Sequence, residues 1–555
     1  MTSEKPKTRN STTTEGVNHQ TGGFESPTRS PFKYPPLPKW EARFYFCVIG
    51  GLLGYGWWIT REATRLNPAP SAGSDVIELP AVGKVHQDKS NYEWQEFKPY
   101  VLDILPLLFA HSLLFNLTMD YLNRWTAECW LLIFSVSASV YLVGLNVVLI
   151  TIFHGFLTFT IGKISKSRLL TFLFAVGQLY STMTGWALFR IIQLPAVLSQ
   201  SAFDVISYSL LSYVTFTIDY LDNYDDLQQS RSFLGCLFRM YSYKFYLPYS
   251  IALIVPYKLY KRQLDERPHR IRDWWSVVFF ALRLAFWFCA AEGILYFFHF
   301  QWLLSDVNFL ETTGLDTLSA LHYAAGQFFH LKYVVIFGFQ SLFAKIDRLN
   351  PYEPPVCIAS VTLYSKIWRG FDRGLYVFFK NYIFLPILKP TFSWSRRLTA
   401  LFLVFAFVLA WHGTEAAMLI WVGANLIEIL IEGVAKFAYS QSALRSLRER
   451  YLSDIWFRRL IAVLQIPVVY ISFMSIFYFL SGQDSAWVFV RRVFLDYVVR
   501  VAWPAGILLP FFAYCYNNMS AECDLYREKR RLAKEKIDRE IAEKAKQLNT
   551  SIKTE

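Results

Sequence analysis

The sequence predicts a helical membrane protein that crosses the bilayer many times. Of its 555 residues, 54% are hydrophobic and 18% are aromatic. The apolar residues gather in runs of about 20, which is long enough to cross a bilayer as α-helices. No long soluble segment interrupts the runs, although a soluble chain of this length would need several domains. Because backbone in lipid must satisfy its own hydrogen bonds, we expect an all-α bundle of about ten to twelve transmembrane and re-entrant helices.

A series of apolar segments supplies the candidates for these helices. The broadest of them could hold two spans each, and the shorter ones are candidates for re-entrant helices. The segments are residues 44–60, 99–118, 129–161, 169–197, 203–218, 236–256, 274–303, 318–345, 374–388, 398–435, 458–481 and 485–515.

Both ends of the chain are polar. Residues 1–40 are rich in Ser, Thr, Pro and charge and contain no apolar run. We therefore expect a disordered cytosolic tail there rather than a cleaved signal peptide. Residues 521–555 mix acidic and basic side chains, which favours a solvated cytosolic helix. The transmembrane domain is expected over residues 41–520.

The net charge of +13 has a topological explanation. Basic residues cluster at 163–168, 258–272, 445–459 and 527–531, and such clusters mark cytosolic loops by the positive-inside rule. Nucleic-acid binding would need this charge on a soluble domain, so we expect no nucleic-acid partner. An acidic stretch at 219–231 is interpreted as a solvated loop, because its irregular spacing does not favour a cation site.

The seven cysteines follow no recognisable framework. They are scattered, mostly within apolar segments, and show neither CxxC or zinc spacing nor a disulfide pattern. Most are interpreted as small core residues. Cys357 differs from the others because it falls in a polar connection.

A histidine in the middle of an apolar stretch is the leading candidate for a functional residue. His412 follows Trp411 and precedes Gly413 within the run from Leu401 to Trp421. An imidazole in hydrocarbon loses its hydrogen bonds to water, so an ionisable residue in this position indicates a functional site. The alternative is a structural histidine bonded to a neighbouring helix.

An aspartate forty residues before His412 is its candidate partner. If the segment around Asp372 is one helix, then Trp368, Phe371 and Asp372 share a face through their i+3 and i+4 spacing. A carboxylate near the histidine would fix its tautomer and stabilise a developing imidazolium. The alternative is that Asp372 pairs locally with Lys380 or Arg369.

These residues belong to an ordered set of motifs that resembles a known family. The set is similar to the membrane-bound O-acyltransferases, and more narrowly to the Hedgehog acyltransferase branch, which has aspartate where other branches have asparagine. The intervals of 15 and 40 residues that separate Cys357, Asp372 and His412 also match that branch. The resemblance covers about residues 330–435. Its motifs are Leu331-Lys-Tyr-Val-Val-Ile-Phe-Gly338, Pro355-Val-Cys357, Trp368, Phe371-Asp372, Gly374-Leu375 and Trp411-His412-Gly413.

The chain also departs from the family pattern. The family often has a Gly-Pro pair after Tyr-Pro or Phe-Pro in an upstream segment. Here Tyr246-Leu-Pro248 is followed, after a longer interval, by Val255-Pro256.

The resemblance implies an enzyme whose catalytic core lies at about residues 330–435. It implies transfer of a long-chain acyl group, palmitoyl above all, from acyl-CoA to a secretory-pathway protein, with an N-terminal cysteine amine as acceptor. His412 would be the general base, and Asp372 would support the transition state. The donor would contact Trp368, Arg369, Arg373 and Lys380, with Lys389 and Arg396 as further cationic candidates. Each of these residues could instead pack or snorkel at a membrane interface. The family also implies a multi-pass protein of the endoplasmic reticulum membrane or the Golgi.

Other functions compete with this interpretation. The same site could acylate a lysophospholipid, a sterol or another lipid, and a chain without activity could bind lipid as a regulator. A transporter is disfavoured because the sequence has neither internal repeats nor paired Gly and Pro breaks.

The resemblance also implies a haem iron bound by Cys357. The alternative is a free or palmitoylated cysteine. His154, His299, His322 and His330 are interpreted as structural. Glu428 and Glu432 could line the acceptor entrance, or pair with arginine on a neighbouring helix.

Overall fold

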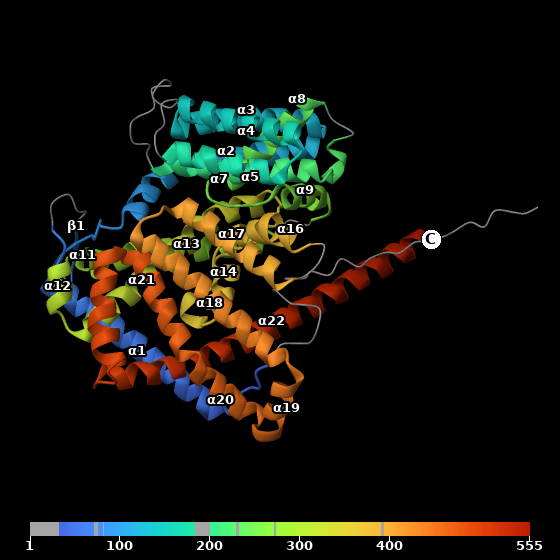
Figure 1. The fold of residues 1–555 in the computed structure, drawn as a ribbon. Coiled ribbons are helices and arrows are strands. Elements are labelled where there is room, and N and C mark those ends of the chain that lie inside the picture. Colours follow the sequence, from blue (N-terminus) through green and yellow to red (C-terminus); the bar gives the residue numbers. More distant parts are fainter. Residues whose placement is uncertain are drawn as a thin grey trace, which may run out of the picture.

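The computed structural model describes residues 33–70, 76–80, 83–183, 200–228, 232–270, 273–389 and 393–554. Most of the tail expected over residues 1–40 lies outside these ranges. The described residues form helices joined by short connections, together with one antiparallel hairpin of β1 (Val76–Leu79) and β2 (Gly83–His86). The predicted all-α fold is confirmed (Figure 1).

The first part of the chain contains α1 and the upper bundle of Figure 1. Its helices are α1 (Lys39–Leu66), α2 (Tyr92–Tyr121), α3 (Arg124–Val143), α4 (Leu145–Ser165), α5 (Arg168–Met183), α7 (Gln200–Leu221), α8 (Phe233–Lys244) and α9 (Tyr257–Glu266).

The second part of the chain packs beneath this bundle. Its first helices are α10 (Trp274–Phe297), α11 (Phe300–Ser305), α12 (Val307–Thr312), α13 (Leu315–Ile346), α14 (Tyr364–Gly370), α15 (Arg373–Phe378) and α16 (Leu385–Leu388). Those that follow are α17 (Trp394–His412), α18 (Ala416–Ser440), α19 (Ser442–Tyr451), α20 (Asp454–Leu464), α21 (Ile466–Phe489) and α22 (Ala505–Thr554). Two π-helical stretches, Phe379–Phe384 and Val490–Val498, interrupt the regular helices.

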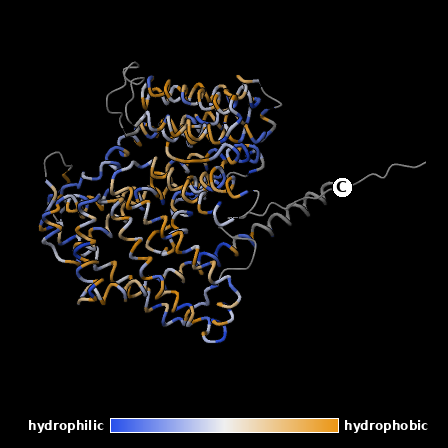
Figure 2. The backbone as a smooth tube through the Cα atoms, viewed as in Figure 1, coloured by the Kyte–Doolittle hydropathy of each residue, from blue (hydrophilic) through white to orange (hydrophobic). Residues whose placement is uncertain are grey.

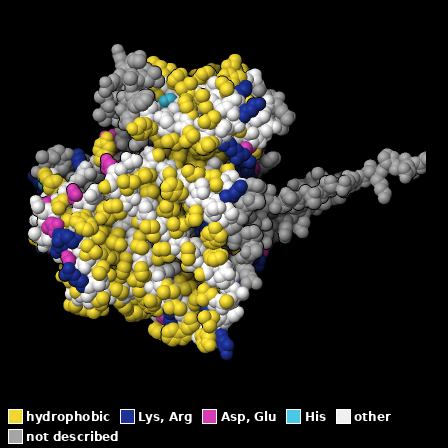
Figure 3. Space-filling view, in the orientation of Figure 1, with side chains coloured by type: hydrophobic (Ala, Val, Ile, Leu, Met, Phe, Trp, Pro, Cys, Tyr) yellow, Lys and Arg dark blue, Asp and Glu magenta, His cyan; other side chains and the backbone are white. Residues whose placement is uncertain are grey.

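Within the described residues, seven helices are long and apolar enough to cross a membrane. Hydrophobic residues predominate along them in Figure 2, and hydrophobic side chains cover much of the face seen in Figure 3. Such a surface suits contact with lipid. The seven helices are α2, α3, α4, α10, α17, α18 and the continuous stretch Asp454–Val498.

Glycines divide the two broadest apolar segments, each of which holds two helices as expected. Gly144 ends α3 at a φ of 88°, and Gly413 ends α17 at a φ of 103°. Residues with side chains rarely adopt this region, whereas glycine enters it without steric cost.

The structure corrects one expectation about a segment and part of another. Residues 236–256 were expected to form a span, but α8 ends at Lys244 and an irregular buried connection follows. Its prolines at 248 and 256 cannot donate to a helix. The acidic stretch 219–231 is interpreted as a solvated loop, which agrees with the exposed Asp222 and Asp225 but not with Asp219, which is 3% exposed and lies within α7.

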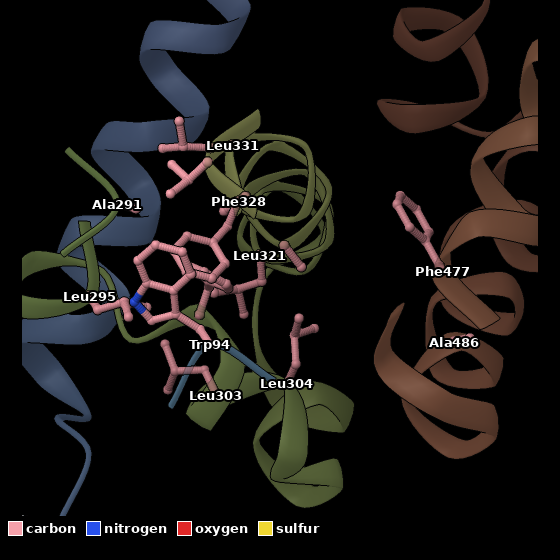
Figure 4. Close-up of a cluster of buried hydrophobic side chains, with 14 of the residues drawn as sticks. Trp94, Ala291, Leu295, Leu303, Leu304, Leu321, Phe328, Leu331, Phe477 and Ala486 are labelled. Carbon is pink, nitrogen blue, oxygen red and sulfur yellow. The ribbon is translucent and has the colours of Figure 1, made fainter. Parts of the chain in front are cut away.

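The largest core surrounds Trp94 at the start of α2. Side chains of α10, α11 and α13 gather around its ring, and Phe477 of α21 lies farther away on the opposite side (Figure 4). The C-terminal helix α22 extends away from the bundle (Figure 1) and includes the described part of the expected polar tail. Since α13 touches α1, α2, α10 and α21, it is the central helix of this core.

Candidate functional site

His412 is the last residue of α17. The chain turns at Gly413 and begins α18 at Ala416, so the imidazole lies at the junction of two membrane-spanning helices. Trp421 and Phe479 pack edge-on against it, with ring centroids 5.0 and 5.5 Å away. His412 is nevertheless exposed. Because aromatic rings hold it while part of its surface stays open, it can meet a substrate.

Asp372 lies at a break between two short helices. Its Oδ1 accepts a hydrogen bond of 2.8 Å from the N–H of Leu375, so the side chain caps the N-terminus of α15. The helix predicted to carry Trp368, Phe371 and Asp372 on one face is therefore wrong, because α14 ends at Gly370. Aspartate is a preferred N-cap because its carboxylate satisfies backbone donors that a helix start leaves free.

Aromatic rings connect Asp372 with His412. Phe371 stacks on Phe329 at 5.2 Å, Phe329 contacts Phe479 at 5.6 Å, and Phe479 contacts His412. Within the described residues, no hydrogen bond or ion pair joins the carboxylate to the imidazole. The expected contact that would fix the histidine tautomer is therefore not formed, and neither is the alternative ion pair with Lys380 or Arg369.

Close packing against an upstream segment holds the Asp372 region in place. A Cβ on Gly374 would lie 2.1 Å from the carbonyl oxygen of Ile254. Four residues farther along that segment, the N–H of Lys258 donates to buried Asp219, which also accepts from the hydroxyl of Tyr382 at 3.0 Å. Two contacts thus fix the broken helix to α7 and to the connection before α9.

Sequence reasoning missed a carboxylate near the histidine. Glu93, at the start of α2, is near enough to interact electrostatically with His412. It accepts hydrogen bonds from the Nζ of Lys332 and, at 2.6 Å, from the hydroxyl of Tyr333. Its side chain is 40% exposed, whereas that of Lys332 is 4% exposed. The lysine within the apolar segment 318–345 was a signal that could have found this pair.

The cationic residues that are candidates for binding the acyl donor lie around the broken helix that contains Asp372. Arg369 and Lys380 are close enough for their like charges to interact, and Arg373 forms an ion pair with exposed Glu353 at 3.1 Å. Arg396 donates instead to the backbone oxygen of Lys389 at 2.8 Å, which ties these two residues to each other.

The remaining candidates on α14 and α18 are tied to neighbouring helices. The indole N–H of Trp368 donates to Asn425 at 3.3 Å. Glu428 accepts from the hydroxyl of Ser472 at 2.6 Å. Glu432 forms an ion pair with Lys436 and accepts from Ser365; among the described residues it interacts electrostatically with Arg369 and Arg397 but forms no direct ion pair with arginine.

The other candidates lie apart from the His412 site. Cys357 is exposed in the connection between α13 and α14. His299 and His322 make hydrogen bonds on both sides of the ring, to backbone atoms and to Ser485, and His330 contacts the carbonyl of Pro355 at 3.5 Å. His154 is buried in α4. The histidine contacts support the structural interpretation.

Comparison with known proteins connects this geometry to a family. The family model of the membrane-bound O-acyltransferases matches residues 197–474, which include Asp372 and His412. Protein-cysteine N-palmitoyltransferase HHAT of Mus musculus is 22% identical over 495 residues, which cover 87% of this chain and 98% of HHAT.

Two further relatives match shorter regions. Protein-cysteine N-palmitoyltransferase Rasp of Drosophila melanogaster is 30% identical over 268 residues, 47% of this chain, so the chain spans about half the length of Rasp, at 51%. Membrane-bound O-acyltransferase GUP1 of Millerozyma farinosa is 23% identical over 257 residues, which cover 46% of this chain and 48% of GUP1. From the family match and these relatives, we conclude that the chain belongs to the membrane-bound O-acyltransferase family.

Proposed function

We propose that this protein transfers a long-chain acyl group, with palmitoyl as the expected chain, from acyl-CoA to the N-terminal amine of a protein in the secretory pathway. The exposed imidazole at the junction of α17 and α18 carries this proposal. The names of HHAT and Rasp support the substrate class, because both are protein-cysteine N-palmitoyltransferases.

His412 acts as the general base. The acceptor nitrogen attacks the thioester carbonyl, a C–N bond forms and the C–S bond breaks. His412 takes the proton from the nitrogen and delivers it to the departing sulfur, so amide and free CoA thiol leave without any other reactant. Positioning both substrates beside the ring makes the attack effectively unimolecular. Asp372 does not contact the histidine. It supports the transition state electrostatically from the other side of the aromatic rings.

Glu93 supports an amine as the acceptor. Its partly exposed carboxylate interacts with His412 and is held in place by Lys332 and Tyr333. An N-terminal ammonium would pair with this carboxylate before it loses a proton. A lipid hydroxyl is neutral and would gain less from this carboxylate, whose charge Lys332 already balances.

Cations near Asp372 support acyl-CoA as the donor. Arg369, Arg373 and Lys380 surround the broken helix and would hold the phosphates of CoA. The acyl chain would then lie in the apolar interior, where each buried CH₂ contributes about 0.8 kcal/mol. The membrane of the endoplasmic reticulum, with the acceptor on its lumenal side, is the proposed location.

A haem bound by Cys357 is a further part of the proposal. The thiol fits this role because it is exposed in a connection between helices, near Tyr323 and Tyr516. A thiolate is a competent axial ligand for haem iron. The acyl transfer has no step that passes through the haem.

The acceptor class can be tested with purified protein. Labelled palmitoyl-CoA is offered to peptides with free N-terminal cysteine, serine or glycine, to the same peptides with acetylated N-termini, and to lysophospholipids and sterols. Label on free N-termini alone is the expected result. Transfer to lipids alone would establish the alternative of a lipid acyltransferase, and absence of transfer to every acceptor would favour a lipid-binding regulator.

A further inference from the structure

A groove opens on the surface of the upper bundle where α4 and α5 meet. The two helices pack against each other (Figure 1) and are joined by a turn at Lys166 and Ser167. The groove has a volume of about 480 Å³, which lies within the range of about 300–1,000 Å³ found for small-molecule sites. The residues that line this α4–α5 groove are Ile161, Ile164, Ser165, Leu170, Leu173 and Phe174.

The lining of the groove is apolar and open to the surroundings of the protein. Ile164 of α4 and Leu173 of α5 are 75% and 58% exposed. Since α4 is one of the helices long and apolar enough to cross a membrane, its exposed apolar side chains suit contact with hydrocarbon. The α4–α5 groove is therefore shaped for an acyl chain.

Basic side chains surround the end of the groove at the turn between the helices. Lys166 is exposed and caps α4 in the left-handed conformation, at a φ of 51°. One turn earlier, the Nζ of Lys163 lies 4.9 Å from the ring centroid of Phe233. Arg168, the first residue of α5, forms an ion pair with Asp222.

The acidic residues around the turn do not balance these cations. Neither α4 nor α5 contains an Asp or Glu residue, and Asp222 offsets Arg168 alone. Within the described residues, Lys163 and Lys166 form no ion pair. Basic pockets at the cytosolic ends of membrane helices attract anionic lipid headgroups, and the positive-inside rule assigns residues 163–168 to that side.

We propose that the α4–α5 groove binds one acyl chain of an anionic glycerophospholipid, whose phosphate pairs with Lys166 and Lys163. Ile161 is five residues before Lys166, or about 7.5 Å along the helix axis, so a chain that starts at the headgroup enters the groove directly. Phosphatidylcholine would gain less, because its headgroup brings a cation of its own to the two lysines. This inference does not depend on the proposed acyl transfer.

The test locates the bound lipid on the full-length protein. Purified protein is placed in phosphatidylcholine nanodiscs with a trace of phosphatidylinositol, which carries a phosphate and no cation. The labelled phosphatidylinositol has a photoreactive diazirine in one acyl chain, close to the glycerol. After irradiation, the modified residues are mapped by mass spectrometry. In separate samples, unlabelled phosphatidylinositol replaces part of the phosphatidylcholine, or palmitoyl-CoA is added.

We expect the label to concentrate on residues 161–174 and to be displaced by unlabelled phosphatidylinositol. Labelling spread evenly over the lipid-facing helices would show ordinary lipid contact and overturn the inference. Displacement by palmitoyl-CoA but not by phosphatidylinositol would assign the groove to another ligand and overturn it as well. Both outcomes are measured on the wild-type protein, so neither requires a variant to fold.

Variants separate the headgroup from the groove. Lys166→Gln should lower labelling of residues 161–174 about fivefold, the size expected for one cation near an anionic surface. Lys39→Gln is the matched control, because Lys39 is also an exposed lysine but lies at the start of α1. Leu173→Trp should fill the groove and remove the label while both lysines remain. Equal labelling in the two lysine variants, or full labelling of Leu173→Trp, would overturn the inference.

Discussion

The imidazole of His412 meets the indole of Trp421 edge to face, with ring centroids 5.0 Å apart and an interplanar angle of 88°. Edge-to-face packing is a favoured arrangement of aromatic rings. It restrains the histidine at the end of α17 through a ring from the next helix. The candidate base is thus positioned by packing, while its exposed surface stays available for substrates.

Replacing His412 with alanine should abolish most acyl transfer. General acid–base catalysis contributes about 10²–10⁴-fold to rate, so turnover of palmitoyl-CoA with a peptide acceptor should fall by that factor. The thermal unfolding midpoint in detergent should stay near that of the wild type, because among the described residues the exposed imidazole makes ring contacts and no hydrogen bond. A well-folded variant with normal turnover would exclude His412 as the base.

Asp372→Asn should separate catalysis from stability. Asparagine caps a helix about as well as aspartate, so α15 should keep its N-terminus and the unfolding midpoint should change little. Turnover should fall by about 10²-fold, the size expected for loss of one preorganised electrostatic group. Asp372→Ala serves as the comparison, because it should lower stability as well. If the asparagine variant is fully active, Asp372 is only a structural cap.

Glu93→Gln should weaken binding of the peptide acceptor and leave binding of the acyl donor unchanged. A hydrogen bond to a charged group is worth enough that KM for a peptide amine should rise about tenfold, while KM for palmitoyl-CoA should stay constant. Glu96→Gln is the matched control, since Glu96 lies on the same helix and is exposed. Equal KM values for the peptide in both variants would remove Glu93 from the acceptor site.

Gly374→Ala should destabilise the protein. The added Cβ would lie 2.1 Å from a backbone oxygen, so the two segments must move apart. Overpacking of this kind costs about 1–3 kcal/mol, and turnover should fall because Asp372 moves with the backbone. Gly423→Ala is the control, since its Cβ would meet nothing within 4 Å. The measurements are the thermal unfolding midpoint and the turnover of both variants. Equal effects of the two substitutions would show that the close contact at Gly374 does not determine stability or activity.

Cys357→Ala should remove a haem signal. The purified wild-type protein is expected to show a Soret band that the variant lacks. The thermal unfolding midpoint of the variant should stay close to that of the wild type. Active wild-type protein without any haem absorbance would reduce Cys357 to a free or lipid-modified cysteine.

Much of the fold could be predicted from the sequence, because lipid imposes a simple rule. A helix that satisfies its own backbone in a bilayer must be long and apolar, so hydropathy located α2, α10 and the pairs divided at Gly144 and Gly413. The same rule singled out His412. An imidazole in hydrocarbon loses its hydrogen bonds to water, and a residue that is placed there despite this cost indicates a functional site. Spacing and motif order then placed Asp372 and Cys357 in the same region of the chain.

Only the tertiary structure decided which residues surround His412. Glu93 and Lys332 are 239 positions apart in the sequence, and no local pattern relates them. Local hydropathy also misjudged residues 236–256 and Asp219, because a buried irregular segment or carboxylate is stabilised by partners from distant helices. The break at Asp372 depends on the same cause. Hydropathy is a local property that indicates which segments lie in lipid. A functional site depends instead on side chains of different helices that pack against one another.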